Sequence, residues 1–184
     1  MPLNLPTYDE NKFSFGPGVI FFGATGSTPT TEVGAITEDG VNIEITSEKK
    51  VITAGNPKVP IYAFSQSQGA KVSFSGIQWN FDHMAKALGA GTTTSAGGED
   101  SFSFGGDPIV SQVAVKVQHA MAVTGHTMNV YLWKAYSEAG MAIGMGADEH
   151  KFPHSYMAMR SATDWAGTTL TYRQQLFKLV KQTA

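Results

Sequence analysis

The chain has 184 residues, and 42% of them are hydrophobic. Its net charge is -2 and it contains no cysteine. This length suits a single domain, the near-neutral charge gives no general argument for nucleic-acid binding, and the lack of cysteine excludes disulfides and thiolate chemistry. Only 15% of the residues are charged, against about a quarter in ordinary domains, so we expect other copies of the chain to cover part of the surface.

The first segment, residues 1–15, predicts an extended arm without hydrophobic periodicity. We find no signal peptide and no apolar run near about 18 residues, so we expect synthesis in a cytosol and no membrane segment. A short apolar strand at 19–22 then enters Gly23-Ala24-Thr25-Gly26, which resembles the start of a dinucleotide-binding turn. Pro29 stands where a third small residue is needed and no helix pattern follows, so we interpret the motif as a loop and expect no cofactor.

The most distinctive pattern is a long pair of strands around a turn. Residues 41–46 alternate between apolar and polar side chains, and a second β-like run at 59–64 follows the turn signal Gly55-Asn56-Pro57. The alternation places Asn42, Glu44 and Thr46 on one polar face. Beyond residue 46 the alternation fades and charge accumulates. We therefore predict a projecting hairpin over residues 47–60 that contacts a neighbouring subunit through Ser47, Glu48, Lys49, Lys50, Asn56 and Lys58.

A strand over residues 70–79 comes next, with a β-bulge predicted at Gly76, where the apolar face changes sides. The one clear helix signal follows at 81–88. Its apolar stripe has helical spacing and consists of Phe81, Met84, Ala85 and Leu88. Asn80 is the expected N-cap and Gly89 the expected C′ residue, while His83 falls on the polar side of the helix.

Residues 89–100 are rich in Gly, Thr and Ser and predict an exposed, flexible loop. Two strands are predicted after it, at 110–121 and 127–136. The second of these is apolar on both faces, with Val130 and Leu132 on one side and Tyr131 and Trp133 on the other. A strand that is apolar on both faces must be covered on both, and another subunit is a candidate for the second cover.

Toward the C-terminus, residues 139–147 predict a strand with one nearly bare face, which would allow another sheet to approach closely. That face is made of Gly140, Ala142, Gly144 and Gly146. Residues 150–160 are strand-like, whereas residues 170–181 fit either a helix or a strand. The methionines of this region are explained equally by core packing and by adaptable contacts between subunits. They are Met141, Met145, Met157 and Met159.

No constellation of residues predicts catalysis. His150 and His154 are four residues apart, but Pro153 opposes a helix, and on a strand they would lie about 13 Å apart, too far for one metal ion. We interpret them as surface or interface histidines. No serine lies in a nucleophile elbow and no carboxylate pair stands out, so we expect neither an enzyme nor a metal site. Trp133 and Trp165 leave open a carbohydrate-binding β-sandwich.

A strand, a long polar-tipped hairpin and a strand–helix run occur here in a recognisable order. The run is Gly69-Ala70-Lys71-Val72-Ser73-Phe74 leading into Trp79-Asn80-Phe81-Asp82-His83-Met84-Ala85-Lys86-Ala87-Leu88-Gly89. Over most of residues 33–136, this order resembles the tail tube proteins of tailed bacteriophages. The resemblance implies a single mainly β domain over residues 1–184, an antiparallel β-sandwich or barrel with one short flanking helix. Type VI secretion tubes share this fold.

The resemblance also implies a function. Members form hexameric rings that stack into the tail tube of the virion, assembled in the cytoplasm of the bacterial host, and the lumen conducts DNA during ejection. The implied partners are other copies of the chain, a tape measure protein, a tail terminator and baseplate or tip proteins. The long hairpin would contact the next ring. Because a conduit should not hold phosphate groups, we predict that Asn42, Glu44 and Thr46 face the lumen. A type VI secretion-like tube and a head decoration protein are the alternatives.

Overall fold

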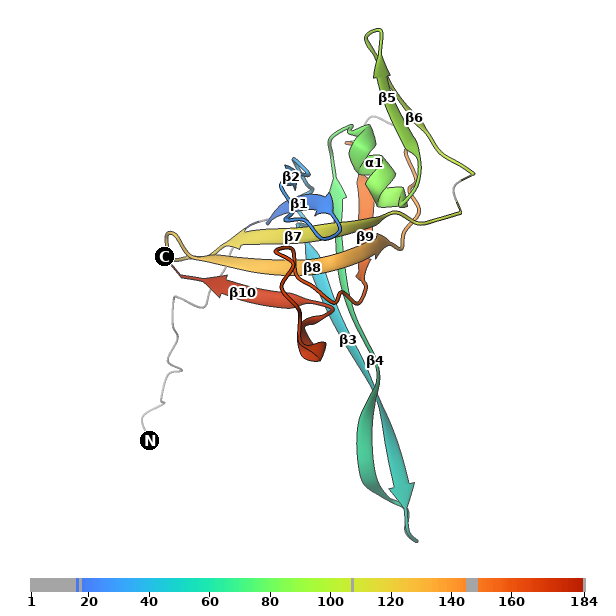
Figure 1. Ribbon diagram of the computed structural model, residues 1–184, viewed down its shortest axis with the longest axis vertical. Coiled ribbons are helices and arrows are strands. Elements are labelled where there is room, and N and C mark those ends of the chain that lie inside the picture. The colour runs from blue at the N-terminus through green and yellow to red at the C-terminus, as the bar shows by residue number, and fades with distance from the viewer. Residues whose placement is uncertain (1–15, 17, 107, 145–148, 184) are drawn as a thin grey trace.

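The computed structural model describes residue 16 and residues 18–106, 108–144 and 149–183. The predicted arm over residues 1–15 lies outside them. In chain order the elements are β1 (Val19–Ala24), β2 (Thr31–Glu32), β3 (Asn42–Ala54), β4 (Val59–Gly76), α1 (Phe81–Leu88), β5 (Thr92–Ala96), β6 (Glu99–Ser103), β7 (Gln112–Ala120), β8 (Thr127–Ser137), β9 (Phe152–Ala158), the 3-10 turn η2 (Tyr172–Gln174) and β10 (Lys178–Gln182). The predicted mainly β, antiparallel fold with a flanking helix and a long projecting hairpin is confirmed (Figure 1).

Eight strands form one sheet that folds over on itself. Their order is β2-β1-β7-β8-β9-β4-β3, and β10 pairs with the first half of β8 while β9 pairs with its end. In a flat sheet, β1 and β4 would be about 19 Å apart, because neighbouring strands are separated by about 4.8 Å. Yet the rings of Phe22 in β1 and Phe74 in β4 lie 6.3 Å apart. The two halves of the sheet therefore face each other as in a β-sandwich, with β8 shared between them (Figure 1).

The hydrophobic core fills the space between these two halves. Alternate side chains of β1, β7, β8, β9 and the last part of β4 form it, among them Ile20, Phe22, Val72, Phe74, Val115, Val117, Val130, Leu132 and Tyr156. Burying one large apolar side chain stabilises a fold by about 1.5–3 kcal/mol. The sandwich is therefore the stable part of the molecule, and the segments that leave it are not needed for its core.

Helix α1 forms where it was predicted, from Phe81 to Leu88. The side chain of Asn80 accepts a hydrogen bond from the backbone N–H of His83 at 3.0 Å, which confirms the N-cap. Gly89 has a φ of 65° and its backbone N–H bonds back to the last turn, which confirms the C′ glycine.

The buried face of α1 differs from the predicted stripe. Met84 is buried as predicted, but its buried companions are His83 and Ala87, while Phe81, Ala85 and Leu88 are half-buried. The prediction that His83 lies on the polar side is therefore wrong. The helix packs between two neighbours, which explains the difference. Its His83 side packs against the sandwich, and its other side packs against the β5–β6 hairpin, where the rings of Phe81 and Phe102 lie 6.4 Å apart.

Two hairpins project in opposite directions along the longest axis of the molecule (Figure 1). The longer is made by β3 and β4, with 13 and 18 residues, and its register shifts between Glu48 and Lys49 and between Ile52 and Thr53. The bulge predicted at Gly76 is wrong, because β4 ends at that residue. The irregularities lie instead in the free two-stranded ribbon, where strand twist is greatest.

The shorter hairpin, β5–β6, occupies most of the segment predicted as an exposed, flexible loop over residues 89–100. Most of these residues are exposed as predicted, but the prediction of a loop is wrong from Thr92 onward, where β5 begins. Ala96 pairs with Glu99 across the two-residue turn Gly97-Gly98. Both glycines have positive φ, 65° and 86°, as a two-residue hairpin turn requires. This Gly-Gly pair, preceded by three β-branched threonines at 92–94, is the signal in the sequence for a hairpin.

The strand predicted over residues 139–147 does not form in its described part, residues 139–144. A Cβ added at Gly140 or Gly144 would meet nothing within 4 Å, so no backbone from the described residues approaches closely there. Ala142 is exposed and Gly146 lies outside the described residues. The predicted strand is therefore wrong over residues 139–144, because no described strand pairs with them. The strand predicted at 150–160 is confirmed as β9, and the ambiguous segment 170–181 forms η2 followed by β10.

The outer face of β8 is covered by the chain itself rather than by a second subunit, so that expectation is wrong. The indole N–H of Trp133 donates to the backbone carbonyl of Gln174 in η2 at 2.9 Å. The ring of Trp165, from the same C-terminal segment, lies 4.8 Å from that of Trp133 and 4.9 Å from that of Tyr131. The two apolar faces that the sequence predicts for β8 are thus both covered within one chain.

Candidate assembly surfaces

The β3–β4 hairpin carries all of its predicted contact residues in exposed positions. These are Ser47, Glu48, Lys49, Lys50, Asn56 and Lys58. The hairpin leaves the core at the pair Ile45 and Ala70. Ala70 is still buried, with 2% exposed, whereas Ile45 opposite it is already 62% exposed. The hydroxyl of Ser67 donates to the Glu48 carboxylate at 2.7 Å, which ties the two strands together. None of the three lysines forms an ion pair within the described part of the chain. Their charges are available to a partner.

The same hairpin exposes large apolar side chains, to between 40% and 64%: Ile45, Val51, Ile52, Val59, Ile61, Tyr62 and Phe64. The register places Lys50 opposite Phe64 and Ile52 opposite Tyr62, and the two aromatic rings lie 6.4 Å apart on one side of the ribbon. Exposed apolar patches mark interaction sites. Sequence reasoning identified the strand at 59–64 but missed this patch, because the pattern does not show that the strand leaves the core.

The predicted lumen residues lie on the outward face of the sandwich. The register across β3, β4 and β9 aligns two rows of side chains on this face, Asn42–Ser73–Ser155 and Glu44–Lys71–Met157, with Thr46 opposite Gly69 in the next row. Side chains in the same row point to the same side of a sheet. Asn42, Glu44 and Thr46 are all exposed, whereas Ser155 is 8% exposed, so the accessible polar groups of this face belong mainly to β3 and β4.

Helix α1 lies on the opposite side of the sheet. Tyr156, next to Met157 in β9, points inward and its ring lies 5.2 Å from that of Phe22. The ring of Phe22 lies in turn 5.8 Å from His83 of the helix. Because neighbouring residues of a strand point to opposite faces, Glu44 lies on the face away from the helix.

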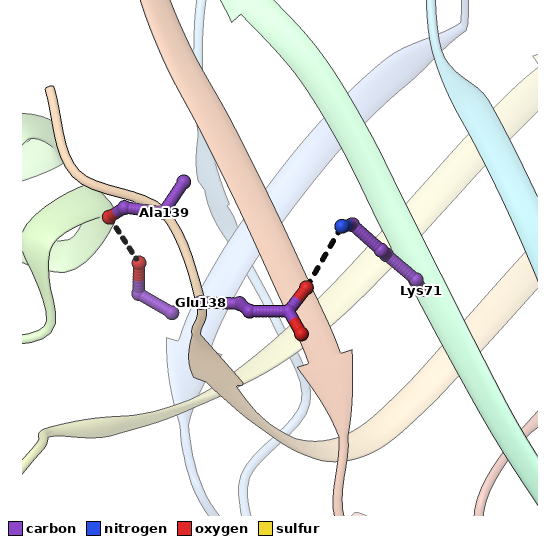
Figure 2. A network of polar contacts seen from close by, with 4 residues as sticks. Lys71, Glu138 and Ala139 are labelled. Atoms are coloured by element: carbon purple, nitrogen blue, oxygen red, sulfur yellow. Dashed lines mark hydrogen bonds and ion pairs between the residues drawn. The ribbon is translucent and has the colours of Figure 1, made fainter. Parts of the chain in front are cut away.

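One ion pair spans the outward face. Lys71 Nζ in β4 lies 2.8 Å from Glu138 Oε2, just after β8, and Figure 2 shows the two side chains meeting across β9. The hydrogen bond to Glu138 raises the pKa of Lys71, and the charges of Glu138 and Glu44 add to this rise although desolvation opposes it. The backbone N–H of Glu138 donates to the carbonyl of Ser155 at 3.0 Å, which positions the carboxylate. The two carboxylates of Glu44 and Glu138 outnumber the single ammonium group of Lys71, so these residues together carry one net negative charge.

The outward face ends at an open sheet edge. β3 is the last strand in the order, so its outer edge from Asn42 to Ala54 is unpaired in the described chain. An open edge presents backbone N–H and C=O groups that can pair with a strand of another chain. The opposite end of the sheet is the two-residue strand β2. The long edge of β3 is therefore the better site for adding a strand.

His154 is buried in the core, so its interpretation as a surface or interface histidine is wrong. Its ring stacks on Phe74 at 4.6 Å, and Nδ1 lies 3.2 Å from the Tyr156 hydroxyl. Burial, helped by the nearby His83, lowers the pKa of His154 to about 4. Burial also lowers the pKa of His83 and raises that of Tyr156. At pH 7 His154 and Tyr156 are therefore neutral and pack as aromatic residues.

His150 does not join this cluster. It is half-buried, and its ring lies 5.6 Å from that of Trp79. In the described part of the chain, no three His, Asp or Glu side chains converge in a way that could hold a metal ion. The Gly23-Ala24-Thr25-Gly26 motif leads from β1 into β2 without a helix, which confirms its interpretation as a loop.

Burial decides whether Trp133 and Trp165 can form a sugar-binding site. Trp133 is 5% exposed and packs against Trp165, so the pair does not form the open aromatic platform that a sugar-binding site needs.

The methionines of the C-terminal region are only partly buried. Met141, Met157 and Met159 are half-buried and Met145 lies outside the described residues. Met157 borders the outward face beside Lys71.

Comparison with protein-family models finds no match, and no curated protein sequence matches the chain. Among the described residues, no helix is long and apolar enough to cross a membrane. The function must therefore be inferred from the surfaces themselves: an apolar and basic hairpin, a polar outward face and an open strand edge.

Proposed function

We propose that this chain is the subunit of a phage tail tube, a virion protein whose copies form hexameric rings that stack into a conduit for DNA ejection. The polar outward face lines the lumen, the open edge of β3 joins neighbours within a ring, and the β3–β4 hairpin reaches the adjacent ring. A tape measure protein occupies the growing tube, and terminator and baseplate or tip proteins bind its ends.

The observation that carries this proposal is the apolar surface of the projecting hairpin. Ile61 and Tyr62 are both more than 60% exposed and touch no part of the core cluster. Burying each of them against a partner would stabilise the contact by about 1–2 kcal/mol. An isolated two-stranded ribbon is at best marginally stable in water. A long ribbon that exposes such side chains is therefore best explained by a partner that covers them.

The outward face supports the conduit rather than another kind of assembly. Its rows combine hydroxyl and amide side chains with a slight excess of negative charge, through Glu44 and Glu138 against Lys71. Basic side chains would bind the phosphates of a passing duplex and slow it. A face with one paired lysine allows DNA to slide without specific binding.

Negative-stain electron microscopy of the concentrated protein tests the proposal. We expect stacked rings with a hollow centre, and sedimentation that shifts to large species as the concentration rises. Isolated particles in the images, together with a monomeric sedimentation profile at every concentration, would contradict the proposal. Binding as caps on capsids, without tubes, would favour a head decoration protein.

A pair of variants tests the role of the hairpin. Replacing Ile61 and Tyr62 together by serine should raise the concentration needed for tube growth about thirtyfold or more, because about 2–4 kcal/mol of burial is lost. Leu179→Ser is the control, since Leu179 is 53% exposed but lies on β10. Both proteins should melt like the wild type, because neither change touches the core. Tubes from the double variant at wild-type concentrations would argue against hairpin contacts.

A further inference from the structure

The two ends of the molecule carry opposite charge. The tip of the β3–β4 hairpin lies at one end of the longest axis, and α1 with the β5–β6 hairpin lies toward the other (Figure 1). The tip carries Lys49, Lys50 and Lys58 against the single carboxylate of Glu48. The opposite end exposes three carboxylates, those of Asp82, Glu99 and Asp100, against the half-buried Lys86 of α1. Copies aligned head to tail along this axis would bring unlike charges together.

A groove lies at the acidic end, between α1 and the β5–β6 hairpin. Trp79, Phe81 and Asp82 line one side and Asp100 lines the other, around a volume of about 460 Å³. The hydroxyl of Thr93 donates to the Asp82 carboxylate at 2.5 Å, which holds β5 beside the helix. Trp79 is 49% exposed, so part of the groove is aromatic.

Asp82 accepts the hydrogen bond from Thr93, but the carboxylate of Asp100 in the groove and that of its neighbour Glu99 remain available. Glu99 and Asp100 form no ion pair in the described part of the chain. The volume of the groove lies in the range of sites that enclose a small organic molecule, which is enough for several side chains of a narrow ribbon. The groove therefore offers acidic side chains and aromatic surface to an occupant that is basic and apolar.

We infer that this groove receives the β3–β4 tip of the next copy of the chain along the tube axis. This inference rests on the proposed function and names the surface that the hairpin contacts. Lys49, Lys50 and Lys58 approach the carboxylates, while Tyr62, on the same side of the ribbon as Phe64, covers the aromatic surface. Complementary charge of this kind selects the partner and its orientation.

The geometry also sets the direction of growth. A contact between two different surfaces at opposite ends of a molecule is heterologous, and along a translation it repeats without closing. A contact between two hairpin tips would instead close into a pair and place lysines against lysines. Tip-to-groove docking therefore gives an open-ended stack with a fixed polarity.

A charge-swap experiment tests the inference. Glu99→Lys with Asp100→Lys should raise the concentration needed for tube growth about tenfold, since two attractive pairs become repulsive. Adding Lys49→Glu and Lys50→Glu in the same chain should restore growth to within about threefold of the wild type. Glu38→Lys with Asp39→Lys is the matched control, because these exposed residues change the charge equally but lie in the loop before β3.

The outcomes separate the inference from the proposed function. If the wild type forms no tubes, the proposed function itself fails. If it forms tubes and the Glu99 and Asp100 variant grows equally well, the docking site is wrong while the function stands. If the Glu99 and Asp100 variant grows poorly and the added Lys49 and Lys50 changes do not restore growth, direct pairing between these two sets of charges is also wrong.

Cross-linking gives a second measurement that does not depend on charge. The chain contains no cysteine, so single cysteines can be placed without background. A Lys50→Cys protein mixed with a Glu99→Cys protein should give cross-linked dimers with a flexible bis-maleimide in assembled tubes, and none when diluted to monomers. Tubes without this cross-link would overturn the inference.

Discussion

His154 is expected to make the stability of the fold depend on pH. Its ring is packed between Phe74 and Phe22 in the core. The titratable groups that face it are His83 from α1 and Tyr156 from its own strand, and neither can neutralise an imidazolium at pH 5. The folded chain must therefore keep this histidine neutral, whereas the unfolded chain can protonate it in water.

The magnitude follows from the two pKa values. An unfolded histidine has a pKa of about 6.5, and burial lowers that of folded His154 to about 4. Because the folded pKa is the lower one, the stabilisation is complete above about pH 6.5 and is lost as the pH falls toward about 4. Linkage gives a loss of about 2 kcal/mol at pH 5 and about 3 kcal/mol at pH 4. His83, whose pKa is also lowered by burial, acts in the same direction.

The matched variant is His154→Phe with Tyr156→Phe. It removes the ionisable ring and also the phenol hydroxyl that would otherwise lose its partner, while a phenyl ring keeps the stacking on Phe74. Urea unfolding at low protein concentration, between pH 8 and pH 5, gives the free energy of unfolding of both proteins. Surface carboxylates titrate equally in the two, so their difference isolates His154. The wild type should lose about 2 kcal/mol more than the variant over this range.

Parallel pH profiles for the two proteins would refute this reasoning, because they would mean that His154 is protonated equally in the folded and unfolded chains. His150→Phe is the control. His150 lies beside Trp79 outside the core cluster, so this change should leave the loss due to His154 in place.

Three further predictions concern the stability of the sandwich, measured by chemical unfolding. Asn80→Ala should cost about 1 kcal/mol through loss of the helix N-cap. Gly23→Ala should cost about 1–3 kcal/mol, because its Cβ would lie 2.8 Å from the backbone of the following loop, whereas Gly140→Ala, in open space, should change little. Trp133→Phe should cost about 1–3 kcal/mol more than Trp165→Phe, because only the first removes a hydrogen bond. The indole N–H of Trp165 is buried and has no partner among the described residues. Equal effects within either of these pairs would contradict the contacts described above.

Local signals in the sequence were sufficient for several elements. The helix needs only its cap residues and apolar spacing, so Asn80 and Gly89 predict both of its ends. The alternation at 41–46 predicts the outward polar face, because side chains of a strand alternate whatever the strand packs against. The Gly-Gly pair of the β5–β6 turn was an equally local signal, hidden in a segment whose composition resembles a loop.

Burial was decided by the tertiary structure alone. His154 lies in the core because β1 folds over β4 and β9, a contact between strands distant in the sequence. The outer face of β8 is covered because residues 161–175 return across it. The strand at 59–64 is exposed because the ribbon runs past the edge of the sandwich. Periodicity in a sequence shows which side chains share a face. Only the folded chain shows whether that face meets its own core, its own C-terminal segment or solvent.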